Sequence, residues 1–179
     1  MAWKVKSSKE VYKNPYMTVT EDEVTTDNGL NLTWGVVHKS EAVGIIPFDG
    51  EYFYLVGQYR YPINLYSWEF PQGHFENHKS IKEAAIHELE EEAGLISENI
   101  IEIGRFFLAP GHNTQEYHVY LATNLKVVGQ KPDPDEEGMK VKKVNITEIK
   151  NMIKNSEIKD GPTISIFKLF ELYLEKNNK

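Results

Sequence analysis

The sequence contains no cysteine, so neither disulfide bonds nor thiolate metal ligands are available to this chain of 179 residues. This absence agrees with a cytoplasmic location. No apolar run approaches the roughly 18 residues that a membrane-spanning helix needs, and the N-terminus lacks the charged and then apolar pattern of a signal peptide. The chain has 20 Lys and Arg residues and 27 Asp and Glu residues. The resulting net charge of −7 disfavours nucleic acid as the main partner.

The remaining composition is that of a soluble domain with a core of its own. Hydrophobic residues make up 40% and charged residues 26% of the chain, both ordinary values for a globular protein. The length suits one domain, or one domain with a small appendage. The negative net charge does not exclude small phosphorylated substrates, because a bound metal ion reverses the local charge.

The N-terminal stretch favours short strands joined by tight turns. Apolar and polar side chains alternate along residues 16–24, as in a half-buried strand. The Asp-Asn-Gly run at 27–29 is a hairpin turn signal, and residues 30–38 are predicted to form the returning strand. A sheet this small buries little apolar surface by itself. We therefore predict a small antiparallel β-sheet subdomain over residues 1–39 that packs on the main domain or on a second subunit.

Residues 40–179 combine strand and helix patterns typical of an α/β (α+β) domain. Strands are predicted at 42–48, 52–59, 100–108, 116–122 and 139–144, helices at 80–94 and 147–154, and a final helix after residue 160. The strand at 139–144 follows a proline-stiffened acidic loop, Lys131-Pro-Asp-Pro-Asp-Glu-Glu-Gly.

The helix at 80–94 carries clear signals for its own boundaries. Ser80 and Glu83 have the spacing of a capping box, and Gly94 suits the left-handed residue that ends a helix. The side chains expected to face the core are Ile81, Ala85 and Leu89.

Three glutamates of that helix, Glu88, Glu91 and Glu92, are related by three- and four-residue spacings and so share one face. Crowded carboxylates repel one another unless a cation lies among them, and oxygen ligands suit a hard divalent ion such as Mg²⁺ or Mn²⁺. The alternative is an ordinary solvated face, which is what most acidic runs on helices are. The flanking sequence favours the metal site.

The segment from Gly73 to Leu95 resembles the signature of the Nudix hydrolases: a glycine, a glutamate and then Arg-Glu-U-x-Glu-Glu-x-Gly-U at fixed spacing, with U an aliphatic residue. The matching residues are Gly73, Glu88, Leu89, Glu91, Glu92, Gly94 and Leu95. Lys79 stands where the family has glutamate, and His87 where it has arginine. The resemblance implies an α/β/α sandwich with a mixed sheet and a Mg²⁺-dependent pyrophosphatase.

Further segments resemble the ADP-ribose pyrophosphatase and nucleoside-diphosphate-sugar hydrolase branch of the family. They are VYKNPYMTVTEDEV, QYRYP, WEFPQG and DGPTIS, and Pro110 follows the signature at the distance typical of this branch. The resemblance implies that a nucleotide sugar, ADP-ribose, GDP-mannose or similar, is cleaved to a nucleoside monophosphate and a sugar phosphate. It also implies a homodimer whose N-terminal sheets are exchanged between subunits.

The resemblance assigns metal-binding and catalytic roles to carboxylates and one carbonyl group. Glu88 and Glu92 correspond to the principal Mg²⁺ ligands, and Glu91 to a further ligand or base. The backbone carbonyl of Gln72 corresponds to another ligand. Glu137 resembles the acid that a loop delivers to the metal or to the attacking water, with neighbouring Glu136 as the alternative.

The same resemblance assigns substrate-binding residues. Arg60 corresponds to an arginine that contacts substrate phosphate, whereas Trp34 and Tyr16 fall where relatives stack the nucleobase. Glu116 lies near the place of an acid that approaches the terminal ribose. Three structural alternatives stay open at this point: Trp34 as a packing aromatic of the sheet, Arg60 as an exposed cation at a strand end, and the acidic run at 135–137 as a solvated loop.

The two departures from the signature predict a slower or more metal-demanding enzyme. Lys79 could neutralise one of the acids, and His87 could donate a hydrogen bond to Glu88. Loss of such supporting groups typically costs about 10–100-fold in metal affinity or activity. The alternative function is a Nudix-fold module that binds or senses nucleotide sugars without efficient turnover.

Overall fold

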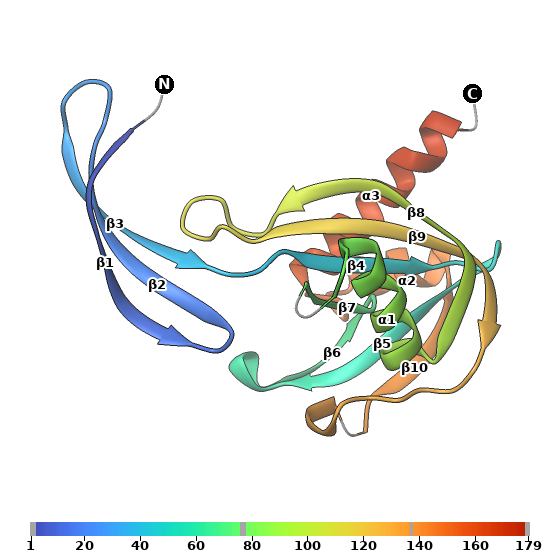
Figure 1. Cartoon of the computed structure of the whole chain (residues 1–179). Coiled ribbons are helices and arrows are strands. Elements are labelled where there is room, and N and C mark those ends of the chain that lie inside the picture. Colours follow the sequence, from blue (N-terminus) through green and yellow to red (C-terminus); the bar gives the residue numbers. More distant parts are fainter. Residues whose placement is uncertain (1–2, 76–77, 137, 178–179) are drawn as a thin grey trace. The chain divides into compact units, whose positions relative to one another are not determined.

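A computed structural model describes residues 3–75, 78–136 and 138–177 (Figure 1). The chain forms two compact units, one made of Met1–Glu41 with Phe107–Tyr117 and the other of Ala42–Phe106 with His118–Lys179. No helix in the described ranges is long and apolar enough to cross a membrane. The predicted catalytic residue Glu137 lies outside the described residues.

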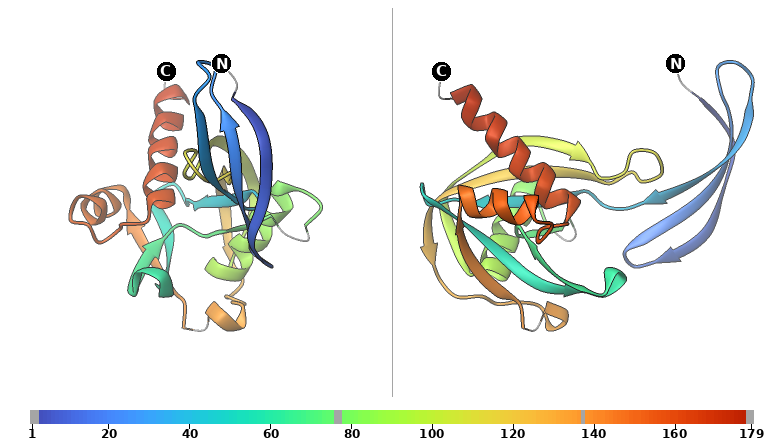
Figure 2. Two further views of the ribbon diagram at one scale, coloured as in Figure 1. Left: turned by 90° about the vertical axis from the view of Figure 1, so that its left-hand side faces the viewer. Right: turned by 180° about the vertical axis from the view of Figure 1, so that it is seen from behind.

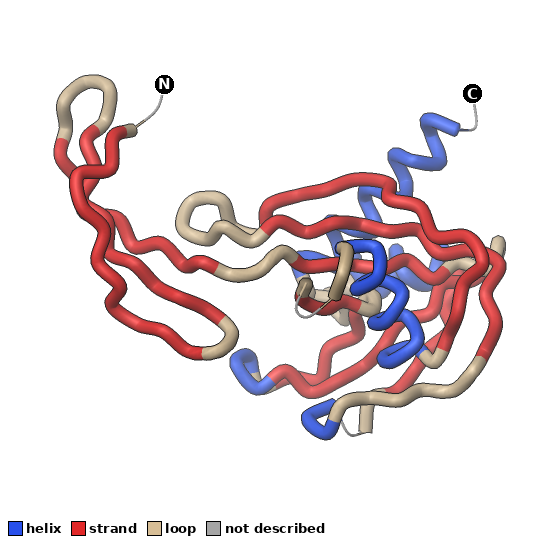
Figure 3. The backbone as a smooth tube through the Cα atoms, in the orientation of Figure 1, coloured by secondary structure: helices blue, strands red, loops and turns tan. Residues whose placement is uncertain are grey.

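The first unit is built on an antiparallel sheet of three strands in sequence order: β1 (Lys4–Asn14), β2 (Met17–Thr25) and β3 (Asn31–His38). The β1–β2 turn is held by the Asn14 side chain, whose Oδ1 accepts hydrogen bonds from the backbone N–H groups of Tyr16 and Met17, both at 2.8 Å. Gly29, with φ of 83°, makes the turn before β3. The predicted N-terminal strands are confirmed, and the described part of this unit consists of strands and loops (Figure 3).

Much of the sheet in this unit is exposed to solvent. Every residue of β1 is exposed except Asn14, and the exposed side chains include large apolar ones. Trp3 packs edge-on against Trp34, with ring centroids 5.3 Å apart. Next to the sheet, the loop after β8 is bridged to β3 through Val37 and Asn113.

In its described residues, the second unit contains two sheets and three α-helices. Three strands, β5 (Tyr52–Arg60), β6 (Leu65–Glu69) and β10 (Lys140–Asn145), form a sheet in the order β10-β5-β6. A four-stranded sheet in the order β7-β4-β9-β8 contains β4 (Ala42–Pro47), β7 (Gln72–His74), β8 (Leu95–Phe107) and β9 (Glu116–Val127). The helices are α1 (Ile81–Ala93), α2 (Ile146–Lys154) and α3 (Gly161–Asn177), and two short 3₁₀ helices cover Tyr61–Ile63 and Pro134–Glu136.

The strands of this unit bury side chains on both faces, because consecutive residues of a strand point in opposite directions. In β9, Val119 and Leu121 pack with α2 and α3, whereas Tyr120 and Ala122 pack with α1. The two helical layers on opposite sides of the strands are visible in Figure 2. This arrangement confirms the predicted α/β class.

The structure also contains elements that the sequence pattern did not predict. β8 starts at Leu95 instead of residue 100, because Gly94 turns the chain directly from helix into strand. β7 is three residues long and the 3₁₀ helix at Tyr61–Ile63 is equally short. Such short elements carry too little periodicity to be recognised from sequence.

Candidate active site

Helix α1 begins and ends where its local signals predict. The Ser80 Oγ atom accepts a hydrogen bond from the Glu83 N–H at 3.1 Å, and the Glu83 carboxylate accepts one from the Lys79 N–H at 2.6 Å. At the other end Gly94 has φ of 64° and donates its N–H to the carbonyl of Glu90. These caps fix the position of the three glutamates along the helix.

The β7 strand lies against the glutamates of α1. Glu92 is only 1% exposed, and its Oε2 atom accepts a hydrogen bond from the Gln72 N–H at 2.8 Å. The half-buried carboxylate of Glu88 lies next to the α-carbon of Gly73, so closely that a Cβ atom on residue 73 would overlap it. The structure therefore brings Gln72 together with Glu88 and Glu92.

The carboxylates of this cluster are held in an environment that disfavours their ionised forms. Burial, assisted by the charges of Glu91 and other nearby acids, raises the pKa of Glu88 from 4.5 to about 8. Burial and the charge of Glu88 raise the pKa of Glu92 well above its ordinary value. The pKa of Glu91 is raised by burial and by nearby acids as well. The cluster is therefore short of positive charge.

Two acids of the loop before β10 belong to the same cluster. The charges of Asp133 and Glu136 both raise the pKa values of Glu88 and Glu91, which places them close to α1. The predicted residue Glu136 is thus brought to the site. Asp133 was not among the predicted site residues, because the acidic composition of the loop alone does not distinguish it from its neighbours.

These residues fit a divalent cation. The donor set consists of carboxylate oxygens, the kind of ligand that Mg²⁺ and Mn²⁺ prefer. A cation would also offset the burial and the mutual repulsion that together raise the pKa values of these glutamates. Gln72, whose N–H binds Glu92, has a buried side-chain Oε1 atom without a hydrogen-bond partner in the described part of the chain, as expected where a ligand or water completes the site.

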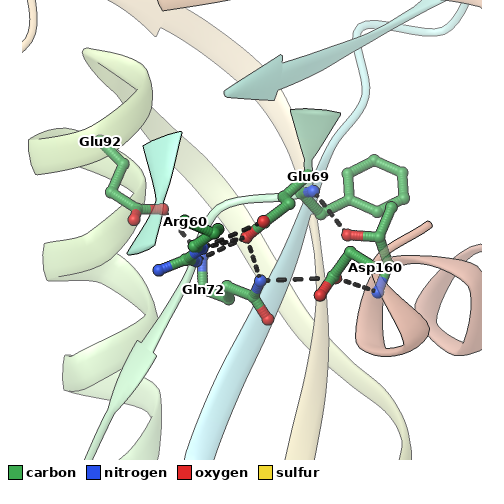
Figure 4. A network of polar contacts seen from close by, with 7 residues as sticks. Arg60, Glu69, Gln72, Glu92 and Asp160 are labelled. Carbon is green, nitrogen blue, oxygen red and sulfur yellow. Dashed lines mark hydrogen bonds and ion pairs between the residues drawn. The ribbon is translucent and has the colours of Figure 1, made fainter. Parts of the chain in front are cut away.

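Arg60 lies at a strand end and is partly exposed, as one interpretation held, but it is also paired with a buried carboxylate. Its Nη2 atom lies 2.5 Å from Glu69 Oε2 and its Nε atom 3.0 Å from Glu69 Oε1, a bidentate pair with a buried carboxylate. The side chain of Arg60 is still 37% exposed. Figure 4 shows this pair between Glu92 and Asp160. Glu69 and Asp160 had no predicted role.

The predicted hydrogen bond from His87 to Glu88 is wrong. His87 Nδ1 instead lies 2.9 Å from Glu91 Oε2. The reason is helical geometry, since residues four apart share a face and adjacent residues diverge by about 100°. The Lys79 ammonium group forms no ion pair with the acids among the described residues, so the expectation that it neutralises one of them is also wrong.

The remaining predicted site residues belong to the first unit. Trp34 is 38% exposed and its Nε1–H donates to the carbonyl of Gly111 at 2.9 Å. Tyr16, at the β1–β2 turn, is 67% exposed. Glu116 is half-buried at the start of β9.

Comparisons with known proteins agree with this geometry. Residues 38–164 match the NUDIX domain, and residues 3–37 match the nucleoside diphosphate sugar hydrolase N-terminal domain. The chain is 25% identical over 168 residues to an ADP-ribose pyrophosphatase of Bacillus subtilis, covering 93% of this chain and 91% of that protein. It is 26% identical over 167 residues to a methanol dehydrogenase activator of Bacillus methanolicus, covering 92% and 90%.

A solved structure has the same fold. A crystal structure of an ADP compounds hydrolase superposes with a TM-score of 0.87 at 18% identity, covering 99% of this chain and 96% of that one. The NUDIX match spans more than half of the chain and includes α1 with its glutamates. The chain therefore belongs to the Nudix family of hydrolases.

Proposed function

We propose that this Nudix enzyme hydrolyses the pyrophosphate bond of nucleoside diphosphate sugars, ADP-ribose, GDP-mannose or similar, to a nucleoside monophosphate and a sugar phosphate. The observation that carries the proposal is the cluster of Glu88, Glu91 and Glu92 on α1, packed against Gly73 and Gln72 of β7, which gathers the oxygen ligands that a divalent cation prefers. The substrate class is supported by the N-terminal domain match and by the B. subtilis relative named for ADP-ribose.

The metal would be Mg²⁺, with Mn²⁺ as a substitute. Glu88 and Glu92 would hold it, helped by Glu91, the carbonyl of Gln72 and Glu137. When bound, such an ion supplies charge neutralisation of phosphate oxygens and a lower pKa for a water ligand.

The chain's own side chains would bind and orient the reactants. Arg60 would hold the phosphates with the N–H groups that Glu69 leaves free. Glu137, or Glu136 beside it, would orient the attacking water and accept its proton. Trp34 and Tyr16 would stack on the base, and Glu116 would contact the terminal ribose; their aromatic and carboxylate chemistry suits those tasks.

A homodimer with exchanged N-terminal sheets is part of the proposal. The exposed apolar side chains of the N-terminal sheet, Trp3, Val5, Val11 and Tyr12 among them, support it, because monomeric proteins rarely leave so much apolar surface in water. A cytoplasmic location agrees with the lack of cysteine.

The test is an assay of the purified protein with Mg²⁺, and separately with EDTA, against ADP-ribose, GDP-mannose, ADP-glucose, UDP-glucose and a dinucleoside polyphosphate. Monophosphate formation from a sugar nucleotide that EDTA and Glu92→Gln both abolish would support the proposal. If the folded protein makes no product even with Mn²⁺, the proposed hydrolysis is refuted. Stabilisation by a nucleotide sugar without product would then favour the binding module.

A further inference from the structure

The carboxylate of Glu69, the last residue of β6, is buried at the centre of the polar network in Figure 4. It is 1% exposed. It accepts hydrogen bonds from Arg60 and from the Gln72 Nε2 atom at 2.6 Å, and Ser67 donates a further one. Burial alone would raise the pKa of Glu69, but these hydrogen bonds and the charge of Arg60 outweigh it and hold the pKa below its ordinary value. Glu69 is therefore a fully paired anion.

On one side Glu69 fixes the guanidinium group of Arg60. The pair uses Nε and Nη2, the edge that gives a planar two-point contact. Nη1 makes no hydrogen bond to the described residues and is left for an external anion. A guanidinium held in one plane loses less entropy when it binds phosphate than one that rotates freely.

On the other side Glu69 holds the segment that reaches the acid cluster. The Gln72 side chain binds Glu69, while the Gln72 backbone N–H binds Glu92. One residue thus connects the buried carboxylate to a predicted metal ligand.

Residues at and just before the start of helix α3 also bind this segment. Asp160 Oδ2 accepts the Thr163 N–H at 2.8 Å and lies 3.4 Å from Gln72 Nε2. The Thr163 hydroxyl accepts the Phe70 N–H at 3.0 Å. The turn between β6 and β7 is therefore held at both ends, and Glu69 has little freedom to move away from Arg60.

We propose that Glu69 is a positioning residue that aligns Arg60 for phosphate binding and connects it, through Gln72, to the acid cluster. The inference rests on the proposed function for its substrate but not for its geometry. If Glu69 acts only through Arg60, replacing both residues should lower kcat/KM no more than replacing Arg60 alone.

The geometric part can be tested without substrate or metal. Arg60 and Arg105 are the two arginines of the chain, so the arginine Nε–H region of an ¹⁵N–¹H spectrum contains two signals, assigned with Arg105→Lys. In Glu69→Gln the exchange of the Arg60 Nε–H with water should accelerate by about tenfold or more, as expected when a hydrogen bond to a charged group is lost. Glu102→Gln, which breaks the pair of Arg105 with Glu102, is the matched control and should affect only the other signal.

The functional part needs a double-mutant cycle of Glu69→Gln and Arg60→Gln, read as kcat and KM separately. Each variant should lose about 10–100-fold in kcat/KM, and the double variant should lose no more than Arg60→Gln. Additive losses, or an unchanged Arg60 signal, would overturn the inference. If Glu69→Gln does not fold, Glu69→Asp, which keeps the charge but shortens the reach, serves in the same cycle.

The two proposals can fail separately. If the wild-type protein shows no turnover, the hydrolase assignment fails, and the exchange measurement still decides whether Glu69 fixes Arg60. If the wild-type protein turns over and the cycle is additive, only the positioning role fails.

Discussion

The carboxylate of Glu88 occupies the space that a side chain on Gly73 would need. Glycine at this position is therefore required for contact between β7 and α1, not for backbone freedom. In Gly73→Ala the Cβ atom should displace Glu88 and lower metal affinity and kcat/KM by about 10–100-fold. Gly161→Ala, whose Cβ would meet nothing within 4 Å, is the control and should leave both unchanged. Equal effects of the two substitutions would show that Gly73 has no special place in the site.

The raised pKa of Glu88 predicts how stability depends on pH without metal. Its pKa is 4.5 ordinarily and about 8 in the folded protein, so the folded state binds more protons between these values. The contribution of this group to stability is therefore complete below pH 4.5 and is lost as the pH rises to 8. In EDTA the melting temperature should fall over this range, and Glu88→Gln should flatten the fall. A Glu88→Gln curve parallel to wild type would contradict the assignment.

Metal binding should show the reverse pH dependence. A cation competes with the proton on Glu88, so the affinity for Mg²⁺ should rise as the pH approaches 8 and protons should be released on binding. Calorimetry in buffers of different ionisation enthalpy measures both quantities. Binding without proton release at pH 7 would mean that Glu88 is not a ligand.

The contact between His87 and Glu91 predicts the effect of restoring the family's residues. His87 reaches Glu91 across one helical turn at 2.9 Å, and its side chain is largely exposed. Lys79→Glu together with His87→Arg would return the supporting pair and should lower the Mg²⁺ concentration for half-maximal activity by about tenfold or more. Lys82→Glu with Ile86→Arg, on the exposed side of α1, is the matched control. No change in the metal requirement would show that the departures are neutral.

Gly94 ends α1 under a steric constraint as well as a conformational one. A Cβ atom there would lie 2.6 Å from the Gln130 nitrogen and 2.7 Å from the Gly129 carbonyl carbon, in addition to the strain of φ at 64°. Gly94→Ala should lower the free energy of unfolding by more than the roughly 1–2 kcal/mol of the left-handed conformation alone. Gly29→Ala, with φ of 83° and nothing within 4 Å, isolates that conformational part. Urea denaturation of both variants gives the difference.

The features that could be predicted from sequence are the local ones. The ends of α1 depend on Ser80, Glu83 and Gly94, which act within one or two turns, and the hairpins depend on their turn residues. The network around Glu69 could not be predicted in the same way. Gln72 and Asp160 are 88 positions apart, and Phe70 and Thr163 are 93 apart, so only the folded chain brings them together.

The end of α1 is also tied to the start of the acidic loop. The N–H groups of Val128 and Gly129 donate to the carbonyl of Gly94, the Lys131 N–H donates to the carbonyl of Glu91, and the Gln130 side chain binds the carbonyl of Glu92. Only one residue separates Lys131 from Asp133, so Asp133 follows directly on a segment that is hydrogen-bonded to the end of the glutamate helix. For loop grafting, suitable cut points therefore lie after Lys131 and before β10. An exchanged segment between them would keep the hydrogen bonds to α1, whereas one that replaced residues 128–131 would lose them and with them its fixed position beside Glu88 and Glu91.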